Sequence, residues 1–246
     1  MVRKNTILVM AGAREAHSLI AALVGRQRRV IASLPEPERM FDNFPVVTRV
    51  GRFETGAAFA SLLDAEAVGS VIDASHSFDA DFSDIAAHTC RRIAIRYLRV
   101  LRPAWRAGRN DIWRSISSIA LAVRDMPSDA RVFANTGWPS LQDYAGFPGE
   151  RVFMRQTLDH TRPPPYKFVE FVSGTPPFSQ FQEQALFGAL RISHLICRNT
   201  GGAASMSKLL AARSLRLPVY MVERKLSKLQ HPVVGTVAEA LAWEAA

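Results

Sequence analysis

Short apolar runs alternate with stretches of helical periodicity along most of the chain. Residues 6–10 form an almost wholly apolar run of strand length, and between residues 16 and 24 the apolar positions recur at the spacing of one helix face. Residues 29–33 predict a second strand. Strands that are apolar throughout and alternate with helices are typical of a parallel sheet covered on both faces.

The same alternation continues through the first half of the chain. It predicts strands at residues 45–50, 70–73 and 93–98, with helices at residues 58–63 and 85–90. Between residues 101 and 111, Pro, Gly and charged residues interrupt both periods, so we place a boundary there. The predicted lobes are residues 1–101 and 102–246.

The second half repeats this order of elements. It predicts strands at residues 131–134, 151–155, 167–172, 194–197 and 218–222, and helices at residues 112–123, 179–190, 203–215 and from Val237 onward. We therefore expect an α/β protein of two Rossmann-like, doubly wound lobes with parallel sheets. The first lobe would bind a dinucleotide, the second would lie on the substrate side, and the active site would lie in the cleft between them.

Composition narrows the class of partner. With 48% hydrophobic and 22% charged residues, the chain has the make-up of an ordinary globular protein. The formal net charge of +9 predicts an anionic partner, but the arginines are dispersed, which disfavours a nucleic-acid-binding tail. The two cysteines have no metal-ligand spacing, and no segment has the length of a membrane span, so we expect a cytoplasmic protein without metal or membrane contact.

The loop after the first predicted strand has small residues where a ligand would approach. Gly12 lies between this strand and the predicted helix, and the N-terminal end of a helix favours phosphate. The spacing differs from the G-x-G-x-x-G of dinucleotide-binding turns, so a plain tight turn is the alternative.

A polar loop also follows the predicted strand at residues 70–73. His76 could donate a proton, hold a phosphate or cap the next helix, and a structural role is at least as plausible from the residues alone. Asp79, Asp81 and Asp84 would lie on different faces of a helix, which favours a solvated acidic face over a metal site.

Two loops of the second half have similar chemistry. Arg198 ends a predicted strand and precedes Gly201 and Gly202, and its guanidinium suits a carboxylate or phosphate. Gly137 lies in a related loop, followed by Trp138, which could stack on a flat ligand or belong to the core. We predict an anion site at the first of these loops, with a structural loop as the alternative.

In order along the chain, the stretches ILVMAGAREA, VIDASHSF, RPAW, NTG, PPFS and CRNTGGAASMSKLLAARSLRLPVYMVER resemble the precorrin-6A reductase family. The resemblance spans nearly the whole chain, and the last stretch is the most specific. It implies two Rossmann-like lobes and NADPH-dependent reduction of the double bond between carbons 18 and 19 of precorrin-6A or its cobalt form. The implied substrate is a polycarboxylated tetrapyrrole, and other enzymes of corrin synthesis are conceivable partners.

The resemblance also implies site residues. For the cofactor they are Gly12, Glu15, Ser75 and Phe78, and for the substrate they are Gly137, Arg198, Asn199, Thr200, Gly201 and Gly202. To the cofactor residues we add Arg14 and Ser33, which could attract a 2′-phosphate. We take His76 as the catalytic acid, with bound water as the alternative. An A-G-R-T type stretch of the family is replaced by residues 34–39. NADH is therefore not excluded as the cofactor, because Glu36 or Glu38 could repel a 2′-phosphate that Arg14, Ser33 or Arg39 would attract.

Three other functions stay open at this point. The same scaffold could serve another NAD(P)-dependent oxidoreductase, because a fold does not determine a substrate. The positive charge could serve nucleic-acid binding, which would need a clustered basic face. A corrinoid carrier without catalysis is the third, because Ala11 and Arg14 alter the first turn.

Overall fold

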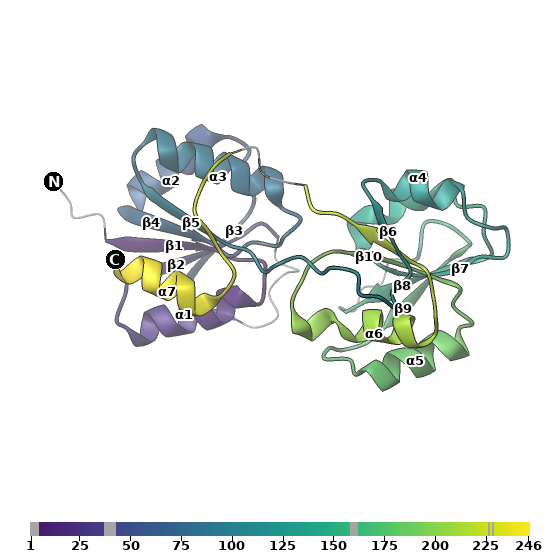
Figure 1. Ribbon diagram of the computed structural model, residues 1–246. Coiled ribbons are helices and arrows are strands. Elements are labelled where there is room, and N and C mark those ends of the chain that lie inside the picture. Colours follow the sequence, from purple (N-terminus) through teal and green to yellow (C-terminus); the bar gives the residue numbers. More distant parts are fainter. Residues whose placement is uncertain (1–4, 37–42, 158–161, 226, 228) are drawn as a thin grey trace. The chain divides into compact units, whose positions relative to one another are not determined.

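The computed structural model describes residues 5–36, 43–157, 162–225, 227 and 229–246. The chain divides into two compact units, Met1–Pro103 with Lys225–Ala246 (unit 1) and Ala104–Arg224 (unit 2), as Figure 1 shows. Within the described residues, no helix combines the length and the apolar character that crossing a membrane requires.

Unit 1 contains a six-stranded parallel sheet. Its strands are β1 (Thr6–Met10), β2 (Val30–Leu34), β3 (Val47–Val50), β4 (Val68–Asp73), β5 (Arg96–Val100) and β12 (Val233–Val234). They lie in the order β3-β2-β1-β4-β5-β12, and every pairing is parallel. This is the strand order of the Rossmann fold, in which the direction of winding reverses between the first and fourth strands.

Helices cover both faces of this sheet. Helices α1 (Glu15–Gly25) and α7 (Val237–Ala245) lie on one face, and α2 (Gly56–Ala65) and α3 (Ala80–Arg92) lie on the other (Figure 1). Successive side chains of a strand point to opposite faces, so Val9 packs with α1 and α7 while Leu8 packs with α2 and α3. Both layers exclude water, which is why β1 is apolar from Ile7 to Met10.

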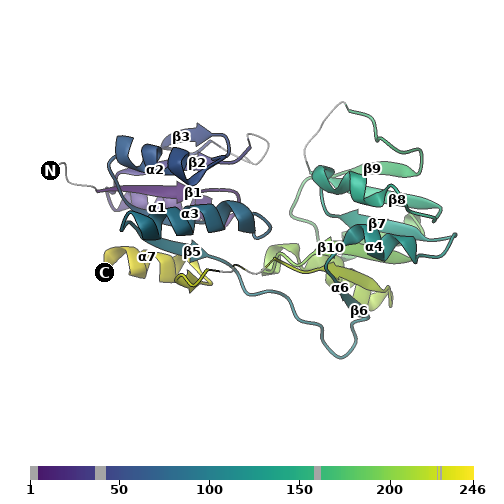
Figure 2. The ribbon, with the colours of Figure 1, turned by 90° about the horizontal axis from the view of Figure 1, so that it is seen from above.

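Unit 2 repeats the arrangement (Figure 2). Its strands are β6 (Trp113–Ile116), β7 (Arg131–Asn135), β8 (Arg151–Gln156), β9 (Val169–Ser173), β10 (His194–Arg198) and β11 (Val219–Val222), in the parallel order β9-β8-β7-β10-β11-β6. Its helices are α4 (Ile119–Arg124), α5 (Gln180–Ala189) and α6 (Ser207–Ser214), with short 3-10 helices η2 (Trp138–Tyr144) and η3 (Ala203–Ser205). The winding direction here reverses between β7 and β10.

The sequence-based prediction of two doubly wound lobes is confirmed, but the predicted helix at residues 112–123 is wrong. This segment is strand β6 followed by helix α4. Ser118 separates them, with an extended backbone and a side-chain Oγ that accepts a hydrogen bond from the Leu121 N–H at 3.4 Å. The short edge strand and the helix happen to place apolar residues at a spacing that resembles one continuous helix.

The structure also corrects the second domain, because residues 225–246 belong to unit 1. Val233 and Val234 pair with β5, and Trp243 of α7 packs on the core beside α1. The returning segment is tied to α3, where the Ser227 hydroxyl donates to Asp84 at 2.5 Å and Lys225 pairs with Asp81. The described residues contain no cluster of potential metal ligands. The Asp81 side chain is 78% exposed, in keeping with a solvated position, and both aspartates have partners in the returning segment.

Candidate dinucleotide and anion sites

The loop after β1 lies at the reversal point of unit 1. Gly12 has a φ of 148°, a backbone conformation that side chains with a Cβ rarely adopt. The Ala11 N–H donates to the Ser33 carbonyl at 2.7 Å, and the Ala13 N–H donates to the Ala74 carbonyl at 2.9 Å. The structure thus brings Gly12 together with the ends of β2 and β4, the position at which sheets of this order bind ligands.

The two predicted residues that follow Gly12 differ in environment. Arg14 is exposed and immediately precedes α1, whose N-terminus receives no side-chain cap from it. Glu15 is in the first turn of α1 and pairs with Arg102 at 3.3 Å. The helix dipole and the positive charge of Arg14 favour binding of an anion here. The negative charge of Glu15 disfavours it, but Arg102 partly neutralises that charge.

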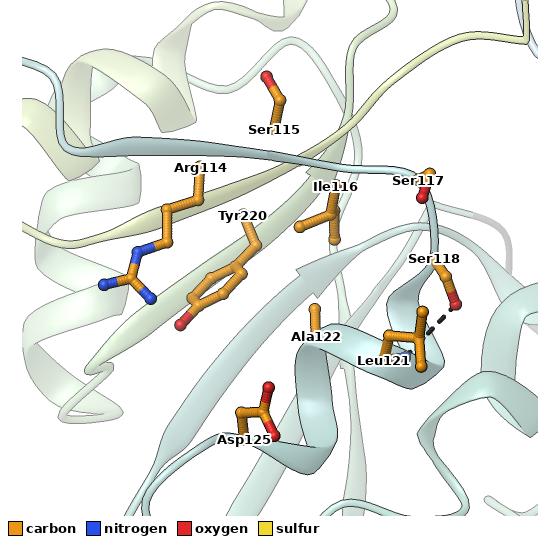
Figure 3. Close-up of a pocket in the computed structure, with 9 residues that line it drawn as sticks. All are labelled: Arg114, Ser115, Ile116, Ser117, Ser118, Leu121, Ala122, Asp125 and Tyr220. Atoms are coloured by element: carbon orange, nitrogen blue, oxygen red, sulfur yellow. Dashed lines mark hydrogen bonds between the residues drawn. The ribbon is translucent and has the colours of Figure 1, made fainter.

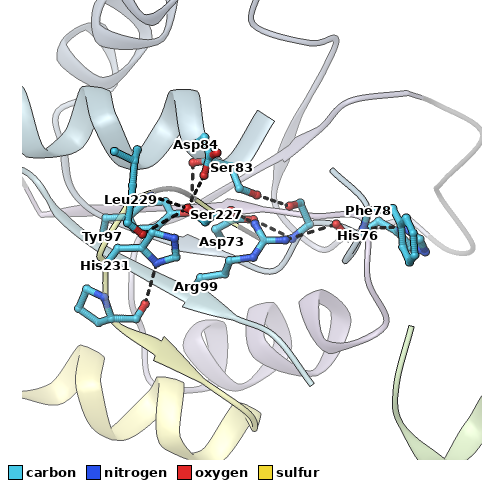
Figure 4. A network of polar contacts seen from close by, with 12 residues as sticks. Asp73, His76, Phe78, Ser83, Asp84, Tyr97, Arg99, Ser227, Leu229 and His231 are labelled. Carbon is cyan, nitrogen blue, oxygen red and sulfur yellow. Dashed lines mark hydrogen bonds and ion pairs between the residues drawn. The ribbon is translucent and has the colours of Figure 1, made fainter. Parts of the chain in front are cut away.

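Asp73 organises the loop after β4 (Figure 4). Its buried carboxylate accepts hydrogen bonds from the Ser75 N–H at 2.9 Å, the Tyr97 hydroxyl at 2.6 Å and the Arg99 guanidinium at 2.7 Å. Burial by itself would raise the pKa of Asp73, but Arg99 and the hydrogen bonds hold this pKa below its ordinary value. The carboxylate therefore stays ionised and holds three donors beneath the loop.

His76 is anchored on this network. The Arg99 guanidinium donates to the His76 carbonyl at 3.4 Å, and the Phe78 N–H donates to His76 Nδ1 at 3.3 Å. With Nδ1 as the acceptor, the proton of the neutral ring is on Nε2. The half-buried ring lies near Phe78, with 6.0 Å between the ring centroids. The Ser75 and Ser83 hydroxyls, 3.2 Å apart, connect the loop to α3.

The loop after β7 is at the corresponding position in unit 2. Gly137 has a φ of 80°, and its carbonyl accepts a hydrogen bond from the Ser140 hydroxyl at 2.8 Å. The same hydroxyl lies 2.7 Å from Thr136 Oγ1, which is 3.1 Å from the buried Tyr144 hydroxyl. These contacts hold Gly137 at the start of η2.

The loop after β10 lies next to the loop after β7, because β7 and β10 are the neighbouring strands at the reversal point of unit 2. Gly201 and Gly202 have φ values of 69° and 84°, and Gly202 makes the sharp turn into η3. Thr200 bends back, its N–H donating to the Arg198 carbonyl at 2.8 Å. The half-buried Arg198 thus comes from the end of a strand next to the glycine turn, as an anion site requires.

Asn199 has a role that the sequence does not reveal. Its amide accepts from the Trp105 N–H at 2.8 Å and donates to the Trp105 carbonyl at 3.1 Å, while the Trp105 indole donates to the Gly202 carbonyl at 3.0 Å. Because Asn199 is almost fully buried and both ends of its amide are engaged, it positions Trp105 and the loop.

Sequence reasoning missed the supporting residues Tyr97, Arg99 and Trp105. A signal was present for Arg99, a charged residue between Leu98 and Val100 in a strand buried on both faces, where an unpaired charge would be costly. It also missed the buried charges of unit 2, Arg155 paired with Glu183 at 2.6 Å.

A pocket of about 360 Å³ lies elsewhere in unit 2, at β6 and the start of α4 (Figure 3). Arg114, Tyr220, Ser118 and Asp125 line it, and no predicted site residue does. Its position beside an edge strand, away from the reversal point, separates it from the glycine loops.

The fold and these loops define a doubly wound α/β protein with glycine turns at both reversal points. The family described as precorrin-6x reductase CbiJ/CobK matches residues 6–245. The chain is 31% identical to the precorrin-6A reductase of Rhodobacter capsulatus over 89% of its own length and 87% of that protein. It is 30% identical to the precorrin-6A reductase of a Sinorhizobium species over 98% and 92% of the two lengths.

A solved structure, described as CobK precorrin-6A reductase, superposes with a TM-score of 0.90 at 29% identity and covers 98% of this chain and 96% of that one. The chain belongs to the precorrin-6x reductase family. This membership makes it an oxidoreductase of cobalamin biosynthesis, and the predicted family resemblance is confirmed.

Proposed function

We propose that the protein reduces the double bond between carbons 18 and 19 of precorrin-6A or its cobalt form with NADPH. The observation that carries the cofactor half of this proposal is Gly12, with its φ of 148°, at the reversal point between β1 and β4. Relatives over nearly the whole length are named precorrin-6A reductases, which supports the substrate half.

The residues of unit 1 fit a dinucleotide. Gly12 and the N-terminus of α1 suit the pyrophosphate, because backbone can approach closely there and the helix dipole favours negative charge. Ser33 is fully buried at the end of β2, and its Oγ has no hydrogen-bond partner among the described residues, as expected for a hydroxyl that a ligand or water engages. Ser75 and Phe78 come from the neighbouring β4 loop. The bound nicotinamide would supply the hydride.

Proton supply is the task we assign to His76. Its Nδ1 accepts the Phe78 N–H, so its Nε2 carries the proton that the reduced ring must gain. The Asp73–Arg99 pair holds the His76 backbone and thereby positions the ring.

Unit 2 would bind the substrate. Arg198, the Thr200 hydroxyl and the backbone of Gly137, Gly201 and Gly202 would offer donors to the carboxylates of a tetrapyrrole. The net charge of +9 would favour the arrival of such a polyanion. In this arrangement Asn199 acts through Trp105.

A dinucleotide titration of Gly12→Val tests the cofactor site. Valine disfavours a φ of 148° and fills the space that the phosphate needs, so NADPH affinity should fall by about an order of magnitude or more. Gly25→Ala, at the other end of α1 with open space around its position, is the matched control and should bind as wild type does. Equal affinity of Gly12→Val and wild type would place the cofactor elsewhere. Tetrapyrrole-dependent oxidation of NADPH by the wild type tests the reaction itself.

A further inference from the structure

A charged corner lies at the carboxyl ends of β2 and β3, formed by Glu36, Arg52 and Asp79. The Arg52 guanidinium is 3.1 Å from the Glu36 carboxylate and 3.4 Å from the Asp79 carboxylate. The Asp79 side chain is only 6% exposed, whereas those of Arg52 and Glu36 are 45% and 41% exposed. Asp79 is therefore a fixed anchor, and the other two charges face solvent.

The backbone ties this corner to the end of β2. The Gly51 N–H donates to the Leu34 carbonyl at 2.8 Å, just after the last paired residues of β2 and β3. Arg52 is the residue that follows this hydrogen bond. In a sheet of this strand order, the residues just beyond β2 face the adenosine ribose. A carboxylate there binds the 2′-hydroxyl of NAD, and an arginine accommodates the 2′-phosphate of NADP.

Ser33 is a polar residue near the end of β2, three positions before Glu36. Side chains alternate along β2, so Ser33 shares a face with Ile31, which belongs to the core beneath α2 and α3. Phe53, the residue after Arg52, belongs to the same core. Ser33 is fully buried, and its Oγ has no hydrogen-bond partner in the part of the chain that the structure describes.

We propose that Arg52 and Glu36 form the pair that sets the choice between the two nicotinamide dinucleotides, with Arg52 binding the 2′-phosphate and Glu36 opposing it. This rests on the proposed dinucleotide site of unit 1. The phosphate displaces Glu36 from the guanidinium, while Asp79 keeps the guanidinium at the corner. Glu38 and Arg39, which were also predicted to act on a 2′-phosphate, lie outside the described residues. Among residues 34–36 there is no cation, and Arg52 supplies one from the β3 loop.

Opposite effects of two substitutions in one ion pair test this proposal. Affinities for NADPH and NADH are measured by fluorescence titration for wild type, Arg52→Gln and Glu36→Gln. Arg52→Gln should weaken NADPH binding about tenfold or more, as expected for a lost hydrogen bond between charged groups, and change NADH binding by less than about twofold. Glu36→Gln should strengthen NADPH binding and raise the ratio of NADPH to NADH affinity.

A merely structural role of the ion pair gives a different result. Either substitution breaks the 3.1 Å contact, so a structural role would move both variants in the same direction and both dinucleotides alike. Adenosine 2′,5′-bisphosphate and AMP, which differ only in the 2′-phosphate, should repeat the pattern without the nicotinamide. Arg92→Gln, an exposed arginine at the end of α3, is the control for loss of one positive charge and should leave the ratio unchanged.

The outcomes separate the two proposals. If wild type binds dinucleotide and Arg52→Gln weakens NADPH and NADH equally, the discrimination proposal is overturned while the cofactor site stands. If wild type binds neither dinucleotide, the proposed function fails and the discrimination proposal with it.

Discussion

Asp73→Asn removes the charge at the centre of the buried network of unit 1 while keeping the shape of the side chain. The Asn amide can still accept from the Ser75 N–H, but its NH₂ group would face the Arg99 and Tyr97 donors that lie 2.7 and 2.6 Å from the carboxylate. The Arg99 side chain, 5% exposed, would then keep its charge without a counter-ion.

Breaking a buried ion pair by removing one partner costs about 3–5 kcal/mol. Native domains have unfolding free energies of about 5–15 kcal/mol, so the variant would lose a large part of its unfolding free energy. For a unit of this size, the midpoint of thermal unfolding should fall by roughly 10–20 °C, measured by calorimetry at pH 7. Asp81→Asn is the control, because its pair with Lys225 is exposed to solvent and should contribute little to stability.

The pH dependence follows from the direction of the pKa shift. The folded protein holds the pKa of Asp73 below its ordinary value of 3.8, so the carboxylate stabilises the fold at higher pH and loses this effect as pH falls through the folded-state pKa. The difference in the free energy of unfolding between wild type and Asp73→Asn should therefore be largest at neutral pH and become smaller in acid. A gap no larger than that of Asp81→Asn, or one independent of pH, would refute the reasoning.

Two further predictions concern buried groups. Asn199→Ala removes the hydrogen bonds at 2.8 and 3.1 Å to the Trp105 backbone. It should lower the free energy of unfolding, measured in urea, by about 1–3 kcal/mol. Unchanged stability would contradict the role assigned to Asn199. Burial raises the pKa of the Cys90 thiol to about 12 and that of the Cys197 thiol to about 11, so both should resist a thiol reagent at pH 8 until urea unfolds the chain. Fast labelling of the native protein would contradict this burial.

Much of the fold follows from local pattern. A central strand of a parallel sheet is covered on both faces, so β1, β4 and β10 each have a run of apolar residues by which they can be found, with polar residues mainly at the strand ends. The loops that bear Gly12, His76 and Arg198 could be located for the same reason, since each begins where such a strand ends. Strand β12 could not be found this way, because two residues are too few to show a period.

Residue pattern alone thus determined the class of fold, the position of the glycine turns and, through the resemblance, the family. Only the tertiary structure decided which loops are neighbours and what their polar residues do. Asp73 pairs with Arg99, which lies 26 positions away in the sequence, and Asn199 binds the backbone of Trp105, which lies 94 positions away. The return of residues 225–246 to unit 1 gives Asp81 and Asp84 their partners. The periodicity of a helix or strand can be recognised from residues that are close in the sequence. The partner of a buried polar group depends on strand order, because the order of the strands brings distant segments together.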